Sequence, residues 1–322
     1  MMRDQKKYHD MPGEMSEGLK NLGYRQVVPE DQSLFDPYYD RMNGFWTSSS
    51  CFPNFIGWMD SFEVYVKIVD DMIINMIYLR NEGYLICGPF LGKYETEKIK
   101  KLVEMVDSEF RILKSRMIFM DIADWMLPYY QVSSIEFEVE DDRDVSDYVF
   151  TPEEFTAGMD TQDDRYRRRY FERKFNYETV EITSAHADEI NEFMDRNWCD
   201  ITGCDACHSG CLKKVILNIV NNFEILRVNG ILVRVDNEPA GLCIVSCRNK
   251  LGVYQYKNAI NRLKGINEYL LYESYERFLK DADIINYTED MGEESLRYYK
   301  EHMAPSFSLS PRLTLKSQGK YY

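Results

Sequence analysis

Long apolar runs are missing from this 322-residue sequence. The most apolar windows, such as MIINMIYL at 72–79, are far too short to cross a bilayer as a helix. The first residues, MMRDQKKYHDMPGEMSEG, contain no apolar core of signal-peptide length. We therefore expect a soluble protein of the cytoplasm, in which the eight cysteines are reduced thiols.

Positive charge and histidine are also scarce. The chain has 39 Lys and Arg residues against 54 Asp and Glu residues, a formal net charge of −15, and only four His residues. This balance disfavours non-specific binding to nucleic acid or to an anionic membrane, so no extended nucleic-acid interface is expected. The sequence shows no order of Ser, His and Asp, or of Cys and His, that would indicate a hydrolase. What is present is 44% hydrophobic residues, enough for sizeable cores.

The hydrophobic pattern occurs twice along the chain. Residues 62–92 hold three apolar runs separated by turn-forming residues, and an amphipathic helical stretch follows at 96–110. Residues 223–257 hold three more such runs, and a helical segment follows at roughly 265–280. This order predicts an α+β protein with two domains, each a mostly antiparallel mixed sheet flanked by helices.

The boundary between the domains is expected in an acidic stretch near residues 140–151. We therefore divide the chain into a loose N-terminal extension, 1–23, a first domain, 24–145, and a second domain, 146–322. The second domain is expected to carry the functional site, because the polar motifs described below lie in it.

Four cysteines and one histidine crowd into the segment WCDITGCDACHSGC. They are Cys199, Cys204, Cys207, Cys211 and His208. The pair at 204 and 207 has the spacing of a metal-binding pair. All five, however, fall within thirteen residues, whereas structural zinc sites more often join ligand pairs from separate segments. We predict no bound metal and no disulfide here; a metal or redox module is the alternative.

The segment NYTEDMGEESLRYYKEHMAP, 286–305, combines an acidic pair with two cations on an expected helix. These residues are Glu289, Asp290, Arg297 and Lys300. In one interpretation Asp290 is only the N-cap of the helix, with Glu293 completing a capping box. In the other, a carboxylate orients or deprotonates an acceptor while the cations neutralise an anion. The buried stripe of the helix is expected to be Leu296, Tyr299 and Met303.

A glycine-containing loop lies upstream, after a strand expected to end at Lys257. The loop, Arg262-Leu263-Lys264-Gly265-Ile266-Asn267, resembles the GNAT acyltransferase signature Gln/Arg-x-x-Gly-x-Gly/Ala at its Arg and central Gly. Such a loop binds phosphate through backbone N–H groups at a helix N-terminus. Asn267 departs from the signature, and a Gly in an ordinary loop is the alternative.

These motifs together resemble the C-terminal domain family of bacterial phosphatidylglycerol lysyltransferases. The strongest part is 254–305, and the resemblance covers roughly 24–315, including SSSCFPNFIGWMDSFEVYV and CGPFLG. It implies a tandem GNAT-like fold, similar also to Fem-type aminoacyltransferases. It further implies transfer of an aminoacyl or acyl group to a hydroxyl or amine acceptor, with an aminoacyl-tRNA or an acyl-CoA as donor.

Members of this family usually carry a Gly followed by a Lys/Arg-rich tract. Here Gly158 is followed first by acidic residues, and the basic residues begin at Arg165. Six basic residues then stand against one Glu in 165–174. They could hold a phosphodiester or the end of a tRNA, or they could form a solvated helix face.

We expect these groups to line one cleft of the second domain, with Asp290 opening the last helix. The expected catalytic residues are Asp290, Glu289 and Lys257. The expected substrate-binding residues are Arg297, Lys300, Arg262, Gly265 and Arg165. A catalytically silent tandem-GNAT protein that binds an amino-acid-like or nucleotide ligand is the alternative to an enzyme.

Overall fold

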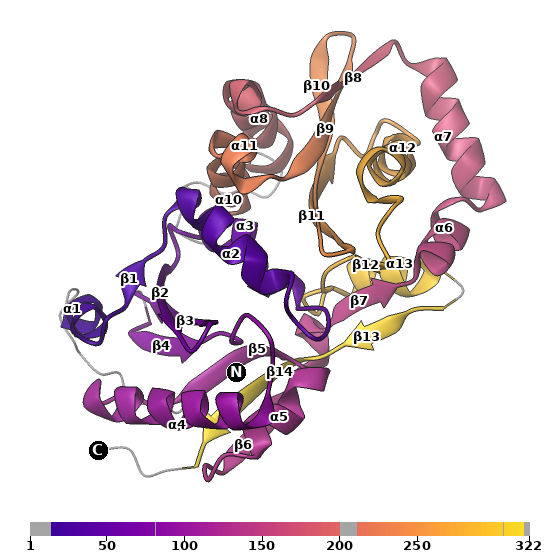
Figure 1. Cartoon of the computed structure of the whole chain (residues 1–322). Coiled ribbons are helices and arrows are strands. Elements are labelled where there is room, and N and C mark those ends of the chain that lie inside the picture. Colours follow the sequence, from indigo (N-terminus) through magenta and orange to yellow (C-terminus); the bar gives the residue numbers. More distant parts are fainter. Residues whose placement is uncertain (1–13, 81, 200–210, 305, 319–322) are drawn as a thin grey trace. The chain divides into compact units, whose positions relative to one another are not determined.

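Two compact units make up the chain, as the computed structural model shows for residues 14–80, 82–199, 211–304 and 306–318. Unit 1 comprises Met1–Ser50, Trp58–Asp141 and Arg312–Tyr322, and unit 2 comprises Cys51–Gly57 and Asp142–Pro311. Each unit contains a seven-stranded sheet flanked by helices (Figure 1). The prediction of two α+β, GNAT-like domains with mostly antiparallel sheets is therefore confirmed.

Two short segments join the unit that their place in the sequence does not predict. Helix α3 (Phe52–Gly57) belongs to unit 2, where it packs against α10 (Leu212–Asn221). Strand β14 (Arg312–Ser317) pairs with β5 and β6 in the sheet of unit 1. The division into 24–145 and 146–322 is wrong at these two places, because long-range strand pairing and helix packing decide where they belong.

The sheet of unit 1 has the strand order β1-β2-β3-β4-β5-β14-β6. Its other strands are β1 (Arg25–Gln26), β2 (Glu63–Val69), β3 (Met72–Leu79), β4 (Tyr84–Cys87), β5 (Ile118–Ala123) and β6 (Phe137–Asp141). Its helices include α1 (Glu14–Asn21), α2 (Gln32–Tyr39), α4 (Thr96–Ile112) and α5 (Leu127–Gln131). Among the described strands of this sheet, β4 and β5 form the one parallel pair.

Helix α1 occupies part of the segment expected to be a loose extension. Met15 and Leu19 lie one helical turn apart and are only 6% and 0% exposed. Such an apolar face stabilises a short helix by packing rather than by intrinsic propensity. The expectation for 1–23 is therefore wrong from residue 14 onward, and residues 1–13 lie outside the described part of the chain.

The sheet of unit 2 has the strand order β13-β7-β12-β11-β10-β9-β8. Its strands are β7 (Asp147–Phe150), β8 (Tyr177–Glu181), β9 (Asn229–Val235), β10 (Glu238–Arg248), β11 (Leu251–Ala259), β12 (Ile284–Asn286) and β13 (Ser308–Ser310). Its other helices include α6 (Pro152–Met159), α7 (Gln162–Lys174), α8 (Ala187–Met194), α11 (Phe223–Leu226), α12 (Ile266–Ser274) and α13 (Glu294–Met303). None of the described helices of either unit is both long and apolar enough to cross a bilayer.

Helices cover both faces of the central strands of unit 2. Helices α6, α7 and α12 lie on one side of β9–β11, and α8, α10 and α11 lie on the other (Figure 1). The core on the α12 side includes Phe155, Phe171 and Leu270, none of which is exposed. Two-residue turns join β9 to β10 and β10 to β11, and their residues have positive φ, as hairpin turns of this length require.

Candidate active site

Strands β11 and β12 run parallel in the middle of the sheet of unit 2, but they pair only along residues 251–253 of β11. Since β11 continues to Ala259, its residues 254–259 extend past the last paired residue of β12, Asn286. We call residues 254–259 the β11 edge. No strand pairs with this edge on the β12 side within the described part of the chain. Its outward backbone N–H and C=O groups can therefore bind another molecule.

A β-bulge brings two side chains of the β11 edge to the same face of the sheet. The ladder with β10 skips Gln255, which is the extra residue. In a regular strand, side chains three positions apart point to opposite faces. Here Tyr254 packs into the core on the α12 side, and Lys257 lies directly across from Cys243 of the same core. The bulge thus places Tyr254 and Lys257 together.

Three tyrosines and a lysine form a cluster beside this edge. Lys257 Nζ lies 5.5 Å from the ring centroid of Tyr299 on α13. The rings of Tyr254 and Tyr287 meet edge to face, with 5.1 Å between centroids. Burial, followed by the neighbouring Tyr299 and Tyr254 hydroxyls, raises the pKa of Tyr287. Because Tyr299 is 40% exposed, the cluster of Tyr254, Lys257, Tyr287 and Tyr299 reaches solvent.

Lys300 is buried beneath the loop that follows β12. Its Nζ donates to the carbonyl oxygens of Tyr287 at 2.5 Å and Glu289 at 2.7 Å, and to Thr288 Oγ1 at 3.2 Å. Burial lowers the pKa of Lys300 to about 8, although the charges of Glu289 and Asp147 act in the opposite direction. The ammonium group holds a strained segment, since Thr288 has φ +58°, a conformation uncommon for a β-branched residue.

Asp290 anchors the same loop from a second point and is poorly suited to be a base. Its fully buried carboxylate accepts hydrogen bonds from Tyr148 Oη at 2.7 Å, Arg143 at 3.0 Å, Arg297 at 2.9 Å and the Gly292 N–H at 2.9 Å. Burial alone would raise the pKa of Asp290, but these donors hold it well below the usual range. A carboxylate so engaged accepts a proton only weakly, so the expectation of Asp290 as a catalytic base is not supported by its surroundings.

The last helix begins later than predicted. Helix α13 starts at Glu294, and Glu293 occupies the N-cap position without a side-chain cap. Asp290 therefore neither opens this helix nor forms a capping box with Glu293. Both sequence interpretations of Asp290 placed it in the helix start, whereas it lies in the preceding loop and holds that loop to Arg143.

The buried face of α13 also differs from the prediction. Leu296 and Tyr299 were expected in the buried stripe, yet they are 37% and 40% exposed. Lys300 and Met303 are buried instead, at 4% and 7% exposed. The physical reason is that the loop turns its carbonyl oxygens toward α13, and a buried hydrogen-bond donor is needed there. Tyr299 is thereby left beside Lys257.

Glu289 is the predicted acid that lies beside Lys300, whereas Asp290 is engaged in ion pairs. It is half-buried, and its charge acts directly on Lys300, whose pKa it raises. The charge of Lys257 acts on Lys300 in the opposite direction and lowers its pKa. Lys257 and Glu289 thus both lie near the buried Lys300, while Asp290 and Arg297 form the ion pair that supports the loop.

The GNAT fold implies coenzyme A, but the start of α12 does not fit its pyrophosphate. Gly265 has φ +95°, and a Cβ added there would lie 2.0 Å from the carbonyl oxygen of Arg167 on α7. The glycine is therefore required by the packing of α7 on this loop. Glu268 adds a carboxylate to the first turn of α12, and Asn267 is hydrogen-bonded to Asn261 at 3.1 Å. A helix start with its glycine packed on α7 and a carboxylate in its first turn is poorly suited to hold a phosphate.

Arg262 and Arg165 are not brought to the β11 edge by any described contact. Arg262 is exposed in the loop before α12 and makes no ion pair among the described residues. Arg165 lies on α7, where its Nη1 contacts Asp160 Oδ2 at 3.0 Å. Their roles in substrate binding stay predictions.

Two residues that support the site were missed in the sequence. Arg143 donates to Asp290, to Tyr148 Oη at 2.6 Å and to Glu301 at 2.9 Å. Both Arg143 and Tyr148 come from the acidic stretch that was interpreted only as a connector. A single arginine among so many acids was the available signal, because a lone cation in such a stretch usually has carboxylate partners.

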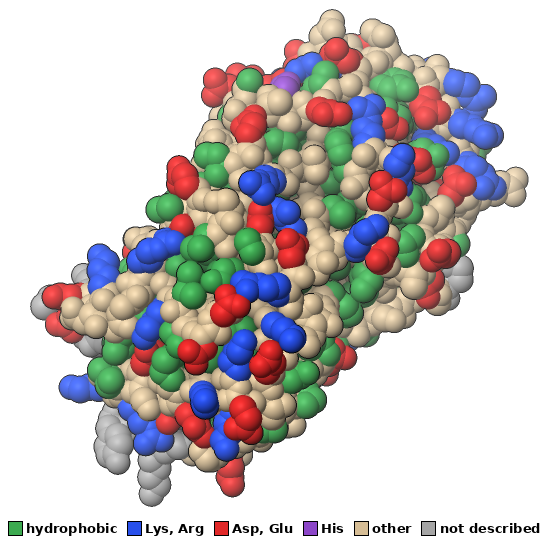
Figure 2. Space-filling model, in the orientation of Figure 1, with side chains coloured by type: hydrophobic (Ala, Val, Ile, Leu, Met, Phe, Trp, Pro, Cys, Tyr) green, Lys and Arg blue, Asp and Glu red, His purple; other side chains and the backbone are tan. Residues whose placement is uncertain are grey.

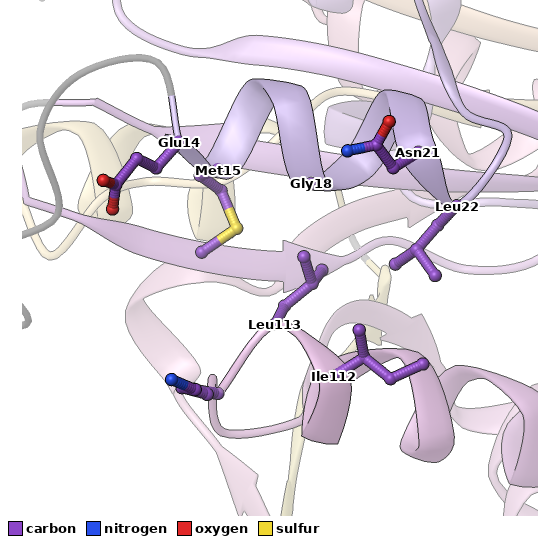
Figure 3. Close-up of a pocket in the computed structure, with 8 residues that line it drawn as sticks. Glu14, Met15, Gly18, Asn21, Leu22, Ile112 and Leu113 are labelled. Atoms are coloured by element: carbon purple, nitrogen blue, oxygen red, sulfur yellow. The ribbon is translucent and has the colours of Figure 1, made fainter.

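A separate hollow of about 350 Å³ lies in unit 1, between α1 and the end of α4 (Figure 3). It is lined by Glu14, Met15, Gly18, Asn21, Leu22, Ile112, Leu113 and Lys114. Figure 3 shows the apolar side chains of Met15, Leu22 and Leu113 directed into the gap between the two helices. Most of the lining residues are apolar or glycine, and we place the candidate site at the β11 edge instead.

The prediction of no metal and no disulfide at the cysteine cluster stays a prediction. Cys204, Cys207 and His208 lie outside the described residues. Cys211, at the start of α10, is described and is buried.

Comparisons with known proteins agree with this architecture. A family model described as phosphatidylglycerol lysyltransferase, C-terminal, matches residues 44–311. None of the curated proteins matches the chain in sequence.

Solved structures resemble the chain in fold. A conserved protein of unknown function from Bacteroides thetaiotaomicron has a TM-score of 0.77 at 19% identity, and the match covers 92% of this chain and 99% of that protein's chain. L-PGS from Bacillus licheniformis has a TM-score of 0.65 at 12% identity, covering 92% and 94%. FemX has a TM-score of 0.57 at 8% identity, covering 91% and 96%. At such identities these likenesses show the fold.

Proposed function

The chain belongs to the phosphatidylglycerol lysyltransferase C-terminal family, and on that premise we propose that it transfers an aminoacyl or acyl group to a hydroxyl or amine acceptor at the β11 edge. One observation carries the proposal: β11 runs six residues past its pairing with β12. This leaves backbone donors beside Lys257, and Glu289 is the nearby acid that we assign to the reaction. A site of this kind suits acyl transfer, in which negative charge develops on a carbonyl oxygen.

The residues suggest one order of events. The acceptor oxygen or nitrogen attacks the carbonyl carbon of the donor ester or thioester, and the acceptor's proton passes to the Glu289 carboxylate. The carbonyl oxygen becomes an oxyanion, which the ammonium group of Lys257 and the N–H groups of the β11 edge stabilise. The intermediate then collapses: the bond to the donor's leaving oxygen or sulfur breaks, and the leaving group takes the proton from Glu289.

Lys300 and Asp290 act as positioning residues in this scheme. All three hydrogen bonds described for Lys300 Nζ go to the loop, two of them to backbone carbonyls. Asp290 fixes the next part of the loop to Arg143 and Arg297. Together they hold Glu289 where it can meet an acceptor beside Lys257, which is the arrangement that acid–base catalysis needs.

A transfer assay with purified Lys257→Ala and Glu289→Gln variants tests the proposal. The donors would be aminoacyl esters and acyl thioesters, and the acceptors would be small amines and alcohols. Each variant should lower kcat/KM by about 10²-fold, the usual effect of removing one oxyanion donor or one acid–base group. Lys280→Ala, on the exposed surface of unit 2, is the matched control and should retain full activity.

Melting temperatures separate a catalytic defect from unfolding. Lys257 and Glu289 are only half-buried, so both variants should melt within a few degrees of the natural protein. Unchanged transfer in both variants would rule out the β11 edge as the reaction site. Binding of amino-acid-like ligands without any turnover would instead favour the silent binding protein.

A further inference from the structure

The β11 edge has a second face, on the side of the sheet opposite to Lys257. Tyr256 lies directly across from Ile244 of β10, whereas the neighbouring β10 residue, Cys243, belongs to the core on the α12 side. Because neighbouring residues of a strand point to opposite faces, Ile244 and Tyr256 lie on the side of the sheet that α10 covers (Figure 1). The bulge places Gln255 on the same side as Tyr256.

Helix α3 supplies a polar side chain to this second face. Five of its six residues are apolar or glycine, and Asn54 is the exception. The Tyr256 hydroxyl donates to Asn54 Oδ1 at 3.0 Å. The helix is fixed on α10, since the Gly57 carbonyl oxygen accepts from Asn218 Nδ2 at 3.0 Å. Apolar packing explains why α3 joins unit 2, but it does not explain why a half-buried amide faces the β11 edge.

The oxygen atoms of this face are oriented to accept hydrogen bonds. Tyr256 gives its single hydroxyl hydrogen to Asn54, so its oxygen can meet a further group only as an acceptor. Gln255 Nε2 donates to Ser246 Oγ at 2.9 Å, while Gln255 Oε1 has no hydrogen-bond partner among the described residues. Gln255 is only 7% exposed, and a buried acceptor without a donor costs free energy. We call Asn54, Gln255 and Tyr256 the α3 face.

The two faces of the β11 edge differ in charge. Lys257 places an ammonium group on the α12 side, which suits a carbonyl oxygen that becomes negative. On the face of the molecule shown in Figure 2, Lys and Arg side chains gather over α7 at the upper right, and α7 also lies on the α12 side. None of the three side chains of the α3 face is charged. This face therefore suits a group that donates hydrogen bonds, and it suits a phosphate poorly.

We propose that the α3 face binds the acceptor substrate, and that this acceptor is a primary amine. Its role as a substrate rests on the proposed function, whereas the binding of an amine does not. In this arrangement the carbonyl group to be attacked lies on the Lys257 side of the β11 edge, and the attacking nitrogen lies on the Tyr256 side. Asn54 acts through Tyr256 and is a positioning residue.

The hydrogens of the acceptor favour an amine over an alcohol. The amine nitrogen attacks the carbonyl carbon, a carbon–nitrogen bond forms, and one proton of the nitrogen passes to Glu289. The bond to the leaving oxygen or sulfur then breaks, and the leaving group takes that proton. The nitrogen keeps one hydrogen throughout, which it can donate to Tyr256. A hydroxyl has a single hydrogen, which Glu289 would take, so it has none left for Tyr256.

Isothermal titration calorimetry with ethanolamine and ethylene glycol tests the binding, since the two probes differ in one amino group. The natural protein should bind ethanolamine at least about fivefold more tightly, as expected for one additional hydrogen bond. Tyr256→Phe should remove this preference. Tyr298→Phe is the matched control, because it removes a hydroxyl from a ring that is 65% exposed on α13 of the same unit, and it should keep the preference.

Variants of Asn54 separate positioning from a merely structural role. Asn54→Leu releases the Tyr256 hydrogen, so that hydroxyl can donate, and the ratio of the two affinities should fall toward one. Asn54→Asp keeps an acceptor for the hydrogen and should retain the ratio. A structural role would weaken the binding of both probes alike and leave the ratio unchanged. If Asn54→Leu does not fold, Tyr256→Phe and Asn54→Asp still carry the test.

Binding and transfer measured together keep the two proposals apart. Equal affinity for the two probes, or an unchanged preference in Tyr256→Phe, would overturn the amine site. Transfer to alcohols as fast as to amines, with no effect of Tyr256→Phe, would also overturn it and leave the proposed function intact. If no transfer is found while amine binding depends on Tyr256, the proposed function fails and the amine site stands.

Discussion

Each unit contains a pair of adjacent parallel strands, but the two units differ in what lies beside that pair. In unit 2, β11 runs on past β12 and leaves an open edge. In unit 1, β4 ends at Cys87, the residue that pairs with Phe119 of β5. The chain then continues along β3: the Gly88 N–H donates to the Asn75 carbonyl oxygen at 3.0 Å, and Leu91 bridges to Ile73. This stretch pairs with β3 as the β11 edge pairs with β10, so the difference between the units lies on the side that faces the parallel partner strand.

Aromatic side chains fill the remaining space in unit 1. The ring of Phe90 stacks on that of Tyr130 at 5.4 Å and meets Phe119 edge to face at 5.6 Å. All three are unexposed, and the Phe90 N–H donates to Tyr130 Oη at 3.1 Å. A backbone donor that could serve a substrate in unit 2 is thus used internally in unit 1. This comparison is the reason for proposing the reaction site in unit 2 and a structural role for unit 1.

The largest expected effect comes from breaking the support of the unit 2 loop. Asp290→Ala leaves Arg143 and Arg297 without their shared buried carboxylate, which should lower the free energy of unfolding by about 3–5 kcal/mol. Chemical denaturation of both proteins measures this. Asp144→Ala is the matched control, because that carboxylate also pairs with Arg297 but is 54% exposed; it should cost less than about 1 kcal/mol. Equal losses would show that burial at Asp290 is unimportant.

A second variant tests whether unit 1 depends on the last strand of the chain. Leu315 of β14 is unexposed between β5 and β6, so Leu315→Ala should destabilise the protein by about 2–5 kcal/mol. Leu309→Ala, a few residues earlier on β13, is the control, since Leu309 is 37% exposed and should matter by less than about 1 kcal/mol. Hydrogen exchange should show the loss in β5 and β6. Loss confined to unit 2 would contradict the pairing.

Lys300 should give the protein a distinctive alkaline pH dependence. Its folded pKa of about 8 lies below the ordinary lysine value of 10.5, so between these values the unfolded chain binds more protons. Stability must therefore rise with pH in that window, by about 2 kcal/mol between pH 7 and 9.5. Because other groups titrate too, the quantity to measure is the difference in unfolding free energy between the natural protein and Lys300→Met. A difference that does not change with pH would mean that Lys300 keeps an ordinary pKa.

The smallest effect concerns the aromatic side chains beside the parallel strand pair of unit 1. Tyr130→Phe keeps the stacked ring but removes the hydroxyl that accepts the Phe90 N–H, which should cost about 1–3 kcal/mol. Transfer activity should be unchanged, because the aromatic side chains around Tyr130 have a structural role. Tyr129→Phe, on the neighbouring and less buried ring, is the control. A loss of activity in Tyr130→Phe at full stability would give unit 1 a catalytic role and break the comparison.

Local patterns predicted the elements well because they depend on neighbouring residues. The three-strand meanders and the helices at 96–110 and 265–280 follow from apolar spacing and turn residues, and the structure contains them. The placement of Gly265 at the start of α12 was also predicted. Its reason was not, since the carbonyl of Arg167 that requires a glycine comes from a distant helix.

The roles within the site needed the tertiary structure. Asp290 and Lys300 stood in the right segment, but their partners, Arg143 and the carbonyls of the loop, could not be seen in the sequence. The bulge at Gln255 that joins Tyr254 to Lys257 depends on the register with β10. Ionisation follows the same rule, because a pKa is set by burial and by charges brought close in space.

By itself, the sequence determined two α+β units, their order of strands and helices, and the segment in which the polar groups gather, because short-range periodicity specifies these. Only the tertiary structure decided that β14 completes the sheet of unit 1, that Lys300 is buried while Tyr299 is exposed, and that one parallel strand pair is filled and the other open. These outcomes depend on pairing and packing between residues far apart in the chain. Strand pairing depends on the side chains packed around it, and a buried polar group is stable only where it finds a hydrogen-bond partner.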